Sequence, residues 1–330
     1  VTVWEMTKAK DMIKASFVYA AETVQGIARQ LGNYQTLTGD PLFVEKFLSD
    51  VDQVSVDDIK NMLQKYMIGQ NKKIVALLTK RVSNPHKFQL ENGLTMLVNK
   101  NQASPSFAFM IGFVGGLKEE PQGKNGIFNA LSKMLLRGTK DKSANAIAKE
   151  IDMLAGNMDA FNGKNIFGLS GKFLSKDIKK VLGLLKEVLT STVFREEELK
   201  TVKGEILSEI RQRDDDPIRN TFIRFNETLY KGHPYSRDPV GNEADIENLK
   251  LNDIEEYYKN YVSPSNAVLA ISGDVDEKEL KAMFENLFFQ WKGRSNPLKK
   301  LPPVATSEKH VVITKDIMQS HLIFGFAGPG

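Results

Sequence analysis

The chain has 330 residues, of which 41% are hydrophobic and 26% charged, a balance that is ordinary for a globular protein and excludes a disordered or fibrous class. This length suits two domains better than one core. The 45 basic and 41 acidic residues are interspersed and leave a net charge of only +4, so no nucleic-acid partner is expected. Cysteine is absent, which excludes thiol catalysis, disulfides and Cys-ligated zinc.

The sequence contains no run of about 18 apolar residues, so we expect no membrane span. Residues 1–10 do not have the pattern of a signal peptide. A cysteine-free protein is compatible with the bacterial periplasm and with the cytoplasm, and both compartments stay open. Because the chain lacks an initiator Met and stops just after an apolar stretch, we interpret it as a fragment of a longer polypeptide.

The first part of the chain predicts helices. Apolar residues at helical spacing indicate one helix over 8–32, which Gly32-Asn33 should end. Two more helices are expected at 41–49 and, after the N-cap signal of Ser55, at 55–66. A short apolar run at 74–78 predicts a buried strand.

The pattern changes after 81–86, which we interpret as a linker. A hairpin with its turn at Glu91-Asn92-Gly93 opens the next region. Strands are then predicted at 87–90, 94–98, 106–115, 166–173 and 267–273, and helices at 125–137, 143–154, 177–189, 195–214, 219–230, 253–261 and 277–287. This mixture indicates an α+β fold with helices packed on a largely antiparallel sheet.

An internal repeat connects the two parts of the chain. Residues 51–59 align with residues 246–254 at a constant offset of 195, and the same offset places Tyr66 on Tyr261. Either short helix-capping segments are alike by chance, or the chain holds two copies of one domain type with the first truncated. We favour the second interpretation.

The region from His86 to Trp291 resembles the first domain of one half of a pitrilysin/insulinase-type zinc metallopeptidase, a family that includes the mitochondrial processing peptidase. The motifs that carry this resemblance are Leu90–Leu94, Gly115–Glu120, His233–Tyr235 with Gly241, Tyr257-Tyr258 and Gly273-Asp274. The resemblance implies that 1–80 is the end of a preceding half's second domain, that 87–295 is a metallopeptidase-like domain, and that 305–330 begins the following domain with its first strand.

In the active half of this family, a His-x-x-Glu-His motif on a helix binds zinc, because two His four residues apart lie on one helix face. The matching positions here are Asn129, Ser132 and Lys133. The family's third ligand, a Glu on a later helix, corresponds to Glu209. The resemblance therefore implies a degenerate half that has neither a catalytic residue nor a metal ligand set, with zinc expected in a catalytic half.

With zinc gone, the Glu209 carboxylate needs another partner if it faces the interior. We hypothesise an ion pair between Lys133 and Glu209 in place of the metal; the alternative is that both side chains point into solvent. His233 is interpreted as a loop histidine with a structural hydrogen bond, and Asp214–Asp216 as a solvated acidic turn. The sequence contains no Gly-x-Ser-x-Gly elbow that would indicate a serine nucleophile. The stretch Gly112–Gly116 is not a phosphate loop, because no Lys-Ser/Thr follows it.

The sequence thus predicts part of a zinc metallopeptidase, containing the half that shapes the chamber for peptide substrates. Its expected partner is a catalytic half, which either belongs to the same polypeptide or is a homologous subunit. The alternative function is a non-enzymatic scaffold subunit that resembles the core proteins of the respiratory cytochrome bc complex.

Overall fold

The computed structural model describes residues 2–20, 24–66, 85–293, 300–302, 311–314 and 321–325. It divides into two compact units, Val1–Arg81 and Val82–Gly330, called unit 1 and unit 2 below. The predicted strand at 74–78 lies outside the described residues, as does most of the predicted linker. His86, which the linker assignment included, is instead the first residue of a strand, because it pairs with Val98.

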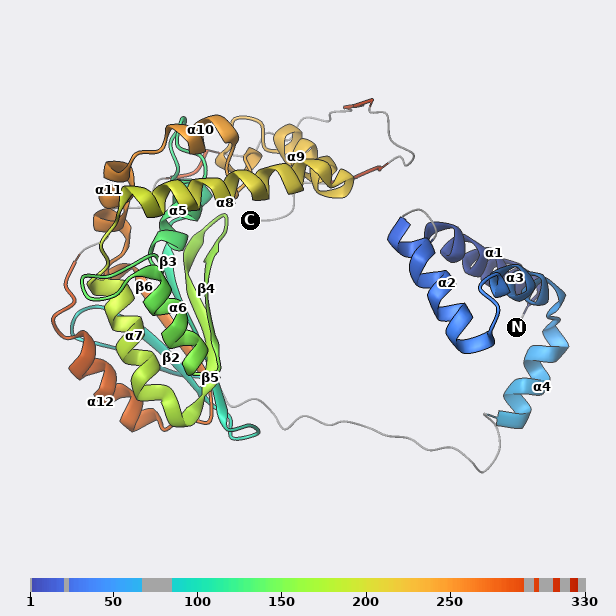
Figure 1. The fold of residues 1–330 in the computed structure, drawn as a ribbon, viewed down its shortest axis with the longest axis horizontal. Helices are drawn as coiled ribbons and strands as arrows, with labels where there is room; N and C mark the ends of the chain where they lie inside the picture. Colours follow the sequence, from blue (N-terminus) through green and yellow to red (C-terminus); the bar gives the residue numbers. More distant parts are fainter. Residues whose placement is uncertain are drawn as a thin grey trace. The chain divides into compact units, whose positions relative to one another are not determined.

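Unit 1 consists, in its described part, of the helices α1 (Val3–Ala20), α2 (Val24–Thr38), α3 (Phe43–Gln53) and α4 (Val56–Tyr66) (Figure 1). The prediction that Gly32-Asn33 ends a helix is wrong, since α2 continues to Thr38. The Thr36 hydroxyl donates to the Gly32 carbonyl within this last stretch, and glycine inside a helix costs only about 1 kcal/mol. None of the described side chains of unit 1 is buried.

Unit 2 is built on a six-stranded sheet with the order β1-β2-β6-β3-β5-β4. Only β2 and β6 pair in parallel, and the other four pairings are antiparallel. The strands are β1 (His86–Gln89), β2 (Thr95–Lys100), β3 (Ser106–Val114), β4 (Asn157–Asn162), β5 (Ile166–Leu174) and β6 (Ala267–Gly273). The predicted α+β class with a largely antiparallel sheet is confirmed.

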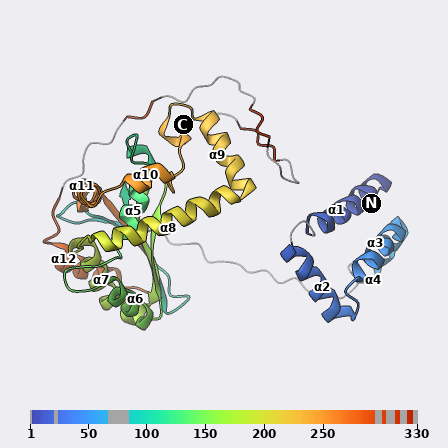
Figure 2. The same ribbon diagram turned by 45° about the horizontal axis from the view of Figure 1, so that its top comes forward.

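The helices of unit 2 lie close to their predicted positions. They are α5 (Ile127–Met134), α6 (Ala144–Met153), α7 (Ile178–Thr190), α8 (Glu196–Asp215), α9 (Pro217–Leu229), α10 (Glu243–Asn248), α11 (Leu251–Tyr261) and α12 (Glu277–Phe288). Helix α5 is shorter than the predicted 125–137, because Gly126 before it has a left-handed backbone with φ of 97°. The sequence analysis missed β4 and the six-residue α10. Figures 1 and 2 show the long α8 running past α5 toward α9.

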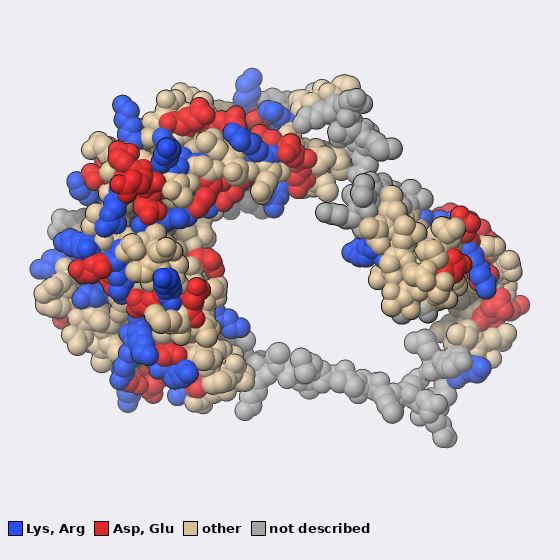
Figure 3. Space-filling model, viewed as in Figure 1, with Lys and Arg blue, Asp and Glu red and all other residues tan. Residues whose placement is uncertain are grey.

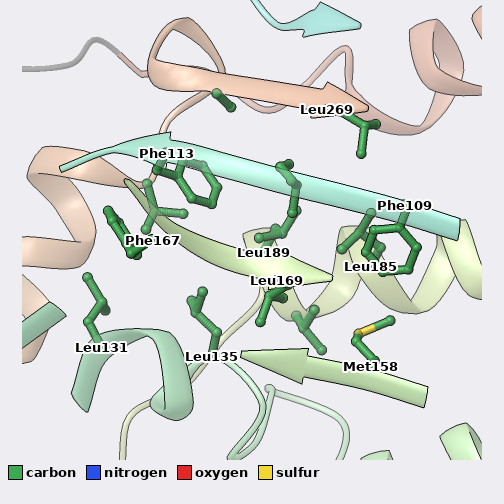
Figure 4. Packing of buried hydrophobic residues seen from close by; sticks show 14 of the residues in the cluster. Phe109, Phe113, Leu131, Leu135, Met158, Phe167, Leu169, Leu185, Leu189 and Leu269 are labelled. Atoms are coloured by element: carbon green, nitrogen blue, oxygen red, sulfur yellow. The ribbon is translucent and has the colours of Figure 1, made fainter. Parts of the chain in front are cut away.

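The core of unit 2 follows from the alternation of side chains along the strands. On β3, every second side chain from Phe107 to Phe113 is buried. These side chains belong to one buried cluster with leucines from α5 and α7, such as Leu131 and Leu185 (Figure 4). The opposite face of the sheet is open, with Met110 46% exposed, as is common for antiparallel sheets packed on one side.

The predicted strand within 305–330 is not found in the described residues of that segment. Residues 311–314 and 321–325 lie in neither a helix nor a strand. A strand needs a neighbour to complete its hydrogen bonds, and no described strand pairs with these residues.

Candidate functional site

The helix that carries the three substituted motif positions is α5, and a buried carboxylate holds its N-terminus. Glu120 Oε2 accepts hydrogen bonds from the Gly126 amide (3.0 Å) and the Asn125 side chain (2.8 Å), and Oε1 accepts one from the Phe128 amide (3.4 Å). This carboxylate therefore satisfies donors that a helix start leaves free. Burial nevertheless raises the pKa of Glu120, and the hydrogen bonds and Arg237 only partly oppose this effect.

The structure brings Lys133 and Glu209 together. Lys133 Nζ lies 2.7 Å from Glu209 Oε1, so the hypothesised ion pair between α5 and α8 is confirmed. The side chains are 23% and 41% exposed, which places the pair at a partly open interface between the helices. Solvent screens a pair with this exposure, so the pair contributes little to the stability of unit 2.

A second ion pair lies one helical turn further along, and the sequence analysis missed it. The Arg137 guanidinium bonds to Glu205, and its Nη1 lies 4.0 Å from Glu198 Oε2. Lys133 and Arg137 are four residues apart, just as Glu205 and Glu209 are. Opposite charges at this spacing on two helices could have predicted both ion pairs, which are called the charge ladder below. Lys133 on α5 and Arg137 just after it thus face Glu209 and Glu205 on α8.

Asn129 and Ser132 do not join this ladder. Asn129 Nδ2 donates to the Val240 carbonyl (3.1 Å), and Ser132 Oγ donates to the Asn129 carbonyl (2.9 Å). The loop at 239–241 receives two more such bonds, from Asn162 Nδ2 on β4 to the Pro239 carbonyl (2.8 Å) and from Arg213 Nη1 on α8 to the Gly241 carbonyl (2.9 Å). Three elements therefore fix this loop beside α5.

The side chains at the motif positions do not fit zinc. Protein zinc sites use His, Cys and carboxylate ligands. The ammonium of Lys133 has no lone pair to donate while it is charged, and the amide and hydroxyl of Asn129 and Ser132 are engaged with backbone carbonyls. Across the described ranges, no group of three or more His, Cys, Asp or Glu side chains has an arrangement that could hold a metal ion.

Two other predicted features have structural roles. His233 is 5% exposed, and its Nδ1 accepts the Tyr235 amide at 3.1 Å, as expected of a loop histidine. Burial, and then the nearby Lys164, lower the pKa of His233. In the acidic turn, Asp216 caps α9 by accepting the amides of Ile218 and Arg219, so this aspartate is more than a solvated charge.

The surface in Figure 3 shows Lys and Arg mixed with Asp and Glu, without a continuous basic stripe on the visible face. In the part of the chain that the structure describes, no helix combines the length and the apolar character that crossing a membrane requires.

Two family descriptions match the chain. "Insulinase (Peptidase family M16)" matches residues 95–242, and "Peptidase M16 inactive domain" matches residues 248–330. The boundary between the two matches falls inside unit 2. Strand β6 from the second match lies between β2 and β3 from the first, so both matched regions contribute to one sheet.

Relatives of known sequence include an uncharacterized zinc protease of Rickettsia bellii, 29% identical over 241 residues, which cover 73% of this chain and 58% of that protein. Subunit 1 of the mitochondrial cytochrome b-c1 complex of Bos taurus is 22% identical over 245 residues, covering 73% of this chain and 51% of the subunit. The chain therefore spans between half and three fifths of the length of these relatives.

Solved structures share the fold. A protease from Helicobacter pylori superposes with a TM-score of 0.62 and 25% identity, over 66% of this chain and 53% of that chain. The periplasmic protease PqqL from Escherichia coli superposes with a TM-score of 0.63 and 16% identity, over 70% of this chain and 26% of that chain. A structure of the first half of PqqL has also been solved.

Proposed function

The chain belongs to the insulinase (M16) family of peptidases, and from this premise we propose that unit 2 is a non-catalytic half that completes the peptide chamber of a zinc metallopeptidase. A catalytic half, in the same polypeptide or in a homologous subunit, supplies the zinc. When bound there, zinc activates a water molecule for attack on the peptide bond. The residues of this chain contribute a wall against which an extended peptide is held in position.

The observation that carries this proposal is the ion pair in the position of a metal ligand set. Lys133 occupies the place of the second motif His and lies 2.7 Å from Glu209, which corresponds to the third ligand. A positive side chain thus takes the place of a positive ion, and α5 and α8 remain joined. Helix α5 therefore keeps its contact with α8 although its motif positions no longer provide metal ligands.

The domain layout forms part of the same proposal. We assign residues 1–80 to the end of a preceding half's second domain, residues 87–295 to the degenerate peptidase-like domain, and residues 305–330 to the start of the next domain. The division of the chain at Arg81 supports the first boundary of this layout.

The first experiment measures zinc content and peptide hydrolysis for this chain, alone and together with a catalytic half of the family. The chain alone is expected to show no zinc-dependent cleavage, and the pair is expected to cleave. Cleavage by the chain alone, abolished by a chelator, would contradict the proposal.

A second experiment restores the motif. The triple variant N129H/S132E/K133H places a His-x-x-Glu-His sequence on α5 within reach of Glu209, and we expect it to bind one zinc per chain at least about 1,000-fold more tightly than the wild type. The same variant with Glu209→Gln loses one ligand and should bind about 10- to 100-fold more weakly than the triple variant. Equal zinc binding by the wild type and the triple variant would show that the site is not degenerate in the way we propose.

The alternative function is a scaffold subunit, and the similarity to the bovine cytochrome b-c1 subunit supports it. If the chain is a scaffold subunit, mixing it with a homologous catalytic half should give no peptidase activity. The chain would instead co-purify stably with partners in an assembly that contains no peptidase activity.

A further inference from the structure

Residues 233–241 lie between α9 and α10 and run beside the start of α5; they are called the strap below. The Arg237 guanidinium donates to three carbonyls within 117–121, at 2.8 to 3.2 Å, in the segment that precedes α5. The three bonds to 239–241 described above tie the other end of the strap to α5, β4 and α8. A change in the shape of the strap would therefore reach the start of α5.

One ring nitrogen of His233 fixes the beginning of the strap. His233 is 5% exposed, and its Nδ1 accepts the Tyr235 amide at 3.1 Å, which caps the short helix η3 (Pro234–Ser236). An imidazole nitrogen accepts a hydrogen bond only when it carries no proton. The strap therefore begins with a cap that exists only while His233 is neutral.

The surroundings of the His233 ring oppose its protonation. Its centroid lies 5.8 Å from that of Tyr230, next to the end of α9, and 4.6 Å from that of Tyr235. The Lys164 ammonium, in the turn between β4 and β5, lies 5.4 and 5.3 Å from the centroids of the same two tyrosines. An imidazolium at His233 would place a second positive charge against rings that already face a cation. Burial and the Lys164 charge both disfavour the protonated ring and lower the pKa of His233.

The other elements packed against η3 carry charges of both signs. These elements are α9 and the short helix η1 (Leu117–Glu119), and two more charged residues flank η3 in the sequence. The charged side chains are Lys118 and Glu119 of η1, Arg219, Arg224 and Glu227 of α9, and the flanking Lys231 and Arg237. Because both signs occur among them, the pKa of His233 follows burial and the Lys164 charge.

We propose that the strap is an acid-sensitive switch beside α5, which is closed while His233 is neutral and opens when His233 takes up a proton from solvent. Protonation turns Nδ1 from an acceptor into a donor that faces the Tyr235 N–H, so the cap of η3 is lost. Because the folded-state pKa lies below the ordinary value of 6.5, the cap is present above pH 6.5 and is lost as pH falls through the folded-state pKa. This switch goes beyond the proposed chamber function and does not depend on it, since its state is read from the strap itself.

The test compares hydrogen exchange of the strap amides in wild type and His233→Asn, each measured at the same pH. An asparagine side chain accepts the amide two residues later in an Asx turn, and it does not titrate. The two proteins should protect the strap equally at about pH 7.5, whereas at about pH 5 the wild-type strap should exchange roughly 5-fold faster than that of H233N, as expected for the loss of one cap. The matched control is His86→Asn, at a histidine whose side chain is 63% exposed, which should follow the wild type at both pH values.

A second arm keeps His233 and changes the charge beside it. Lys164→Met retains an unbranched side chain over the tyrosine rings without its charge, so the strap should open at a higher pH than in wild type. This arm tests the switch even if the H233N strap is already loose at neutral pH. Nuclear magnetic resonance of the four histidines, with the His233 signals identified by their loss in H233N, gives the titration and the tautomer of the ring. The proposal is overturned if wild type and H233N show the same pH course of strap exchange, if K164M opens at the pH of wild type, or if neutral His233 carries its proton on Nδ1.

Discussion

Unit 1 and unit 2 differ most in what their helices cover. In unit 2, side chains such as Phe113, Phe128 and Leu185 are fully buried in one core of sheet and helices. Among the described residues of unit 1, the closest aromatic contact is between Phe17 and Phe47, with centroids 5.3 Å apart, and both side chains remain partly exposed. Caps and amphipathic patterns therefore suffice to define helices, whereas a stable unit also needs apolar surface removed from water.

The largest expected effect tests this difference directly. Phe128→Ala removes a ring that contacts Phe167, Tyr257 and Tyr261, with centroids between 4.8 and 5.3 Å away, and should cost about 3–5 kcal/mol of unfolding free energy in unit 2. Phe47→Ala in unit 1 should cost roughly 1 kcal/mol, because its ring is only partly buried.

The chain offers a separate probe for each unit, because its two tryptophans are Trp4 in unit 1 and Trp291 in unit 2. Urea unfolding followed by fluorescence in W4F and W291F backgrounds reports each unit by itself. A loss in unit 1 upon Phe47→Ala as large as the loss in unit 2 upon Phe128→Ala would show that unit 1 has a core of its own.

The same contrast explains how much of the fold the sequence could predict. Strand β3 was predicted because Phe107, Phe109, Ile111 and Phe113 alternate with less buried positions. Strand β4 was missed, because it lies at the edge of the sheet and its sequence, from Asn157 to Asn162, mixes polar and apolar residues without regular alternation. Edge strands bury less, so they leave a weaker pattern.

The site divides in a similar way. The Lys133–Glu209 pair was predictable, because the family motif fixes both positions and the charges are opposite. The hydrogen bonds from Asn129, Asn162 and Arg213 to the loop at 239–241 were not, since this loop reaches α5 only through the tertiary fold. A pattern of local spacing carries no information about carbonyl groups that lie 28, 77 and 111 residues away from their donors in the sequence.

A smaller effect is expected at the matched caps of the repeat. Ser55→Ala removes the Ser55 hydroxyl, which accepts the Asp58 amide at 3.1 Å, and should reduce the stability of α4 by about 1 kcal/mol. Lys250→Ala at the same place before α11 should change little, because Lys250 contributes its backbone amide to the cap and the substitution keeps that amide.

Hydrogen exchange over 56–66 and over 251–261 measures the two helices in one experiment. Faster exchange is expected in α4 of S55A, with α11 of K250A unchanged. If S55A and K250A reduced the protection of α4 and α11 equally, packing on α5 would add no protection to α11. The contrast between a packed unit 2 and an open unit 1 would then be wrong.

The smallest effects concern pH, and their signs should be opposite. Burial raises the pKa of Glu120 above its ordinary value of 4.5, so its contribution to the stability of unit 2 is present at low pH and is lost as pH rises through the folded-state pKa. Hydrogen bonds from the Ser55 side chain and amide lower the pKa of Asp58 below 3.8, so its contribution to unit 1 is present above 3.8 and is lost as pH falls through the folded-state pKa.

Unfolding of E120Q and D58N, each compared with wild type from about pH 3 to about pH 7, measures these contributions. The E120Q difference should shift in favour of the variant as pH rises above 4.5. The advantage of wild type over D58N should vanish in acid. Because burial is what raises the pKa of Glu120 whereas local hydrogen bonds lower that of Asp58, opposite slopes would agree with a carboxylate that is shielded from water in unit 2 and an exposed one in unit 1. Slopes of the same sign would mean that Glu120 remains solvated, and the helix start of α5 would then be held by exposed bonds of the kind that hold α4.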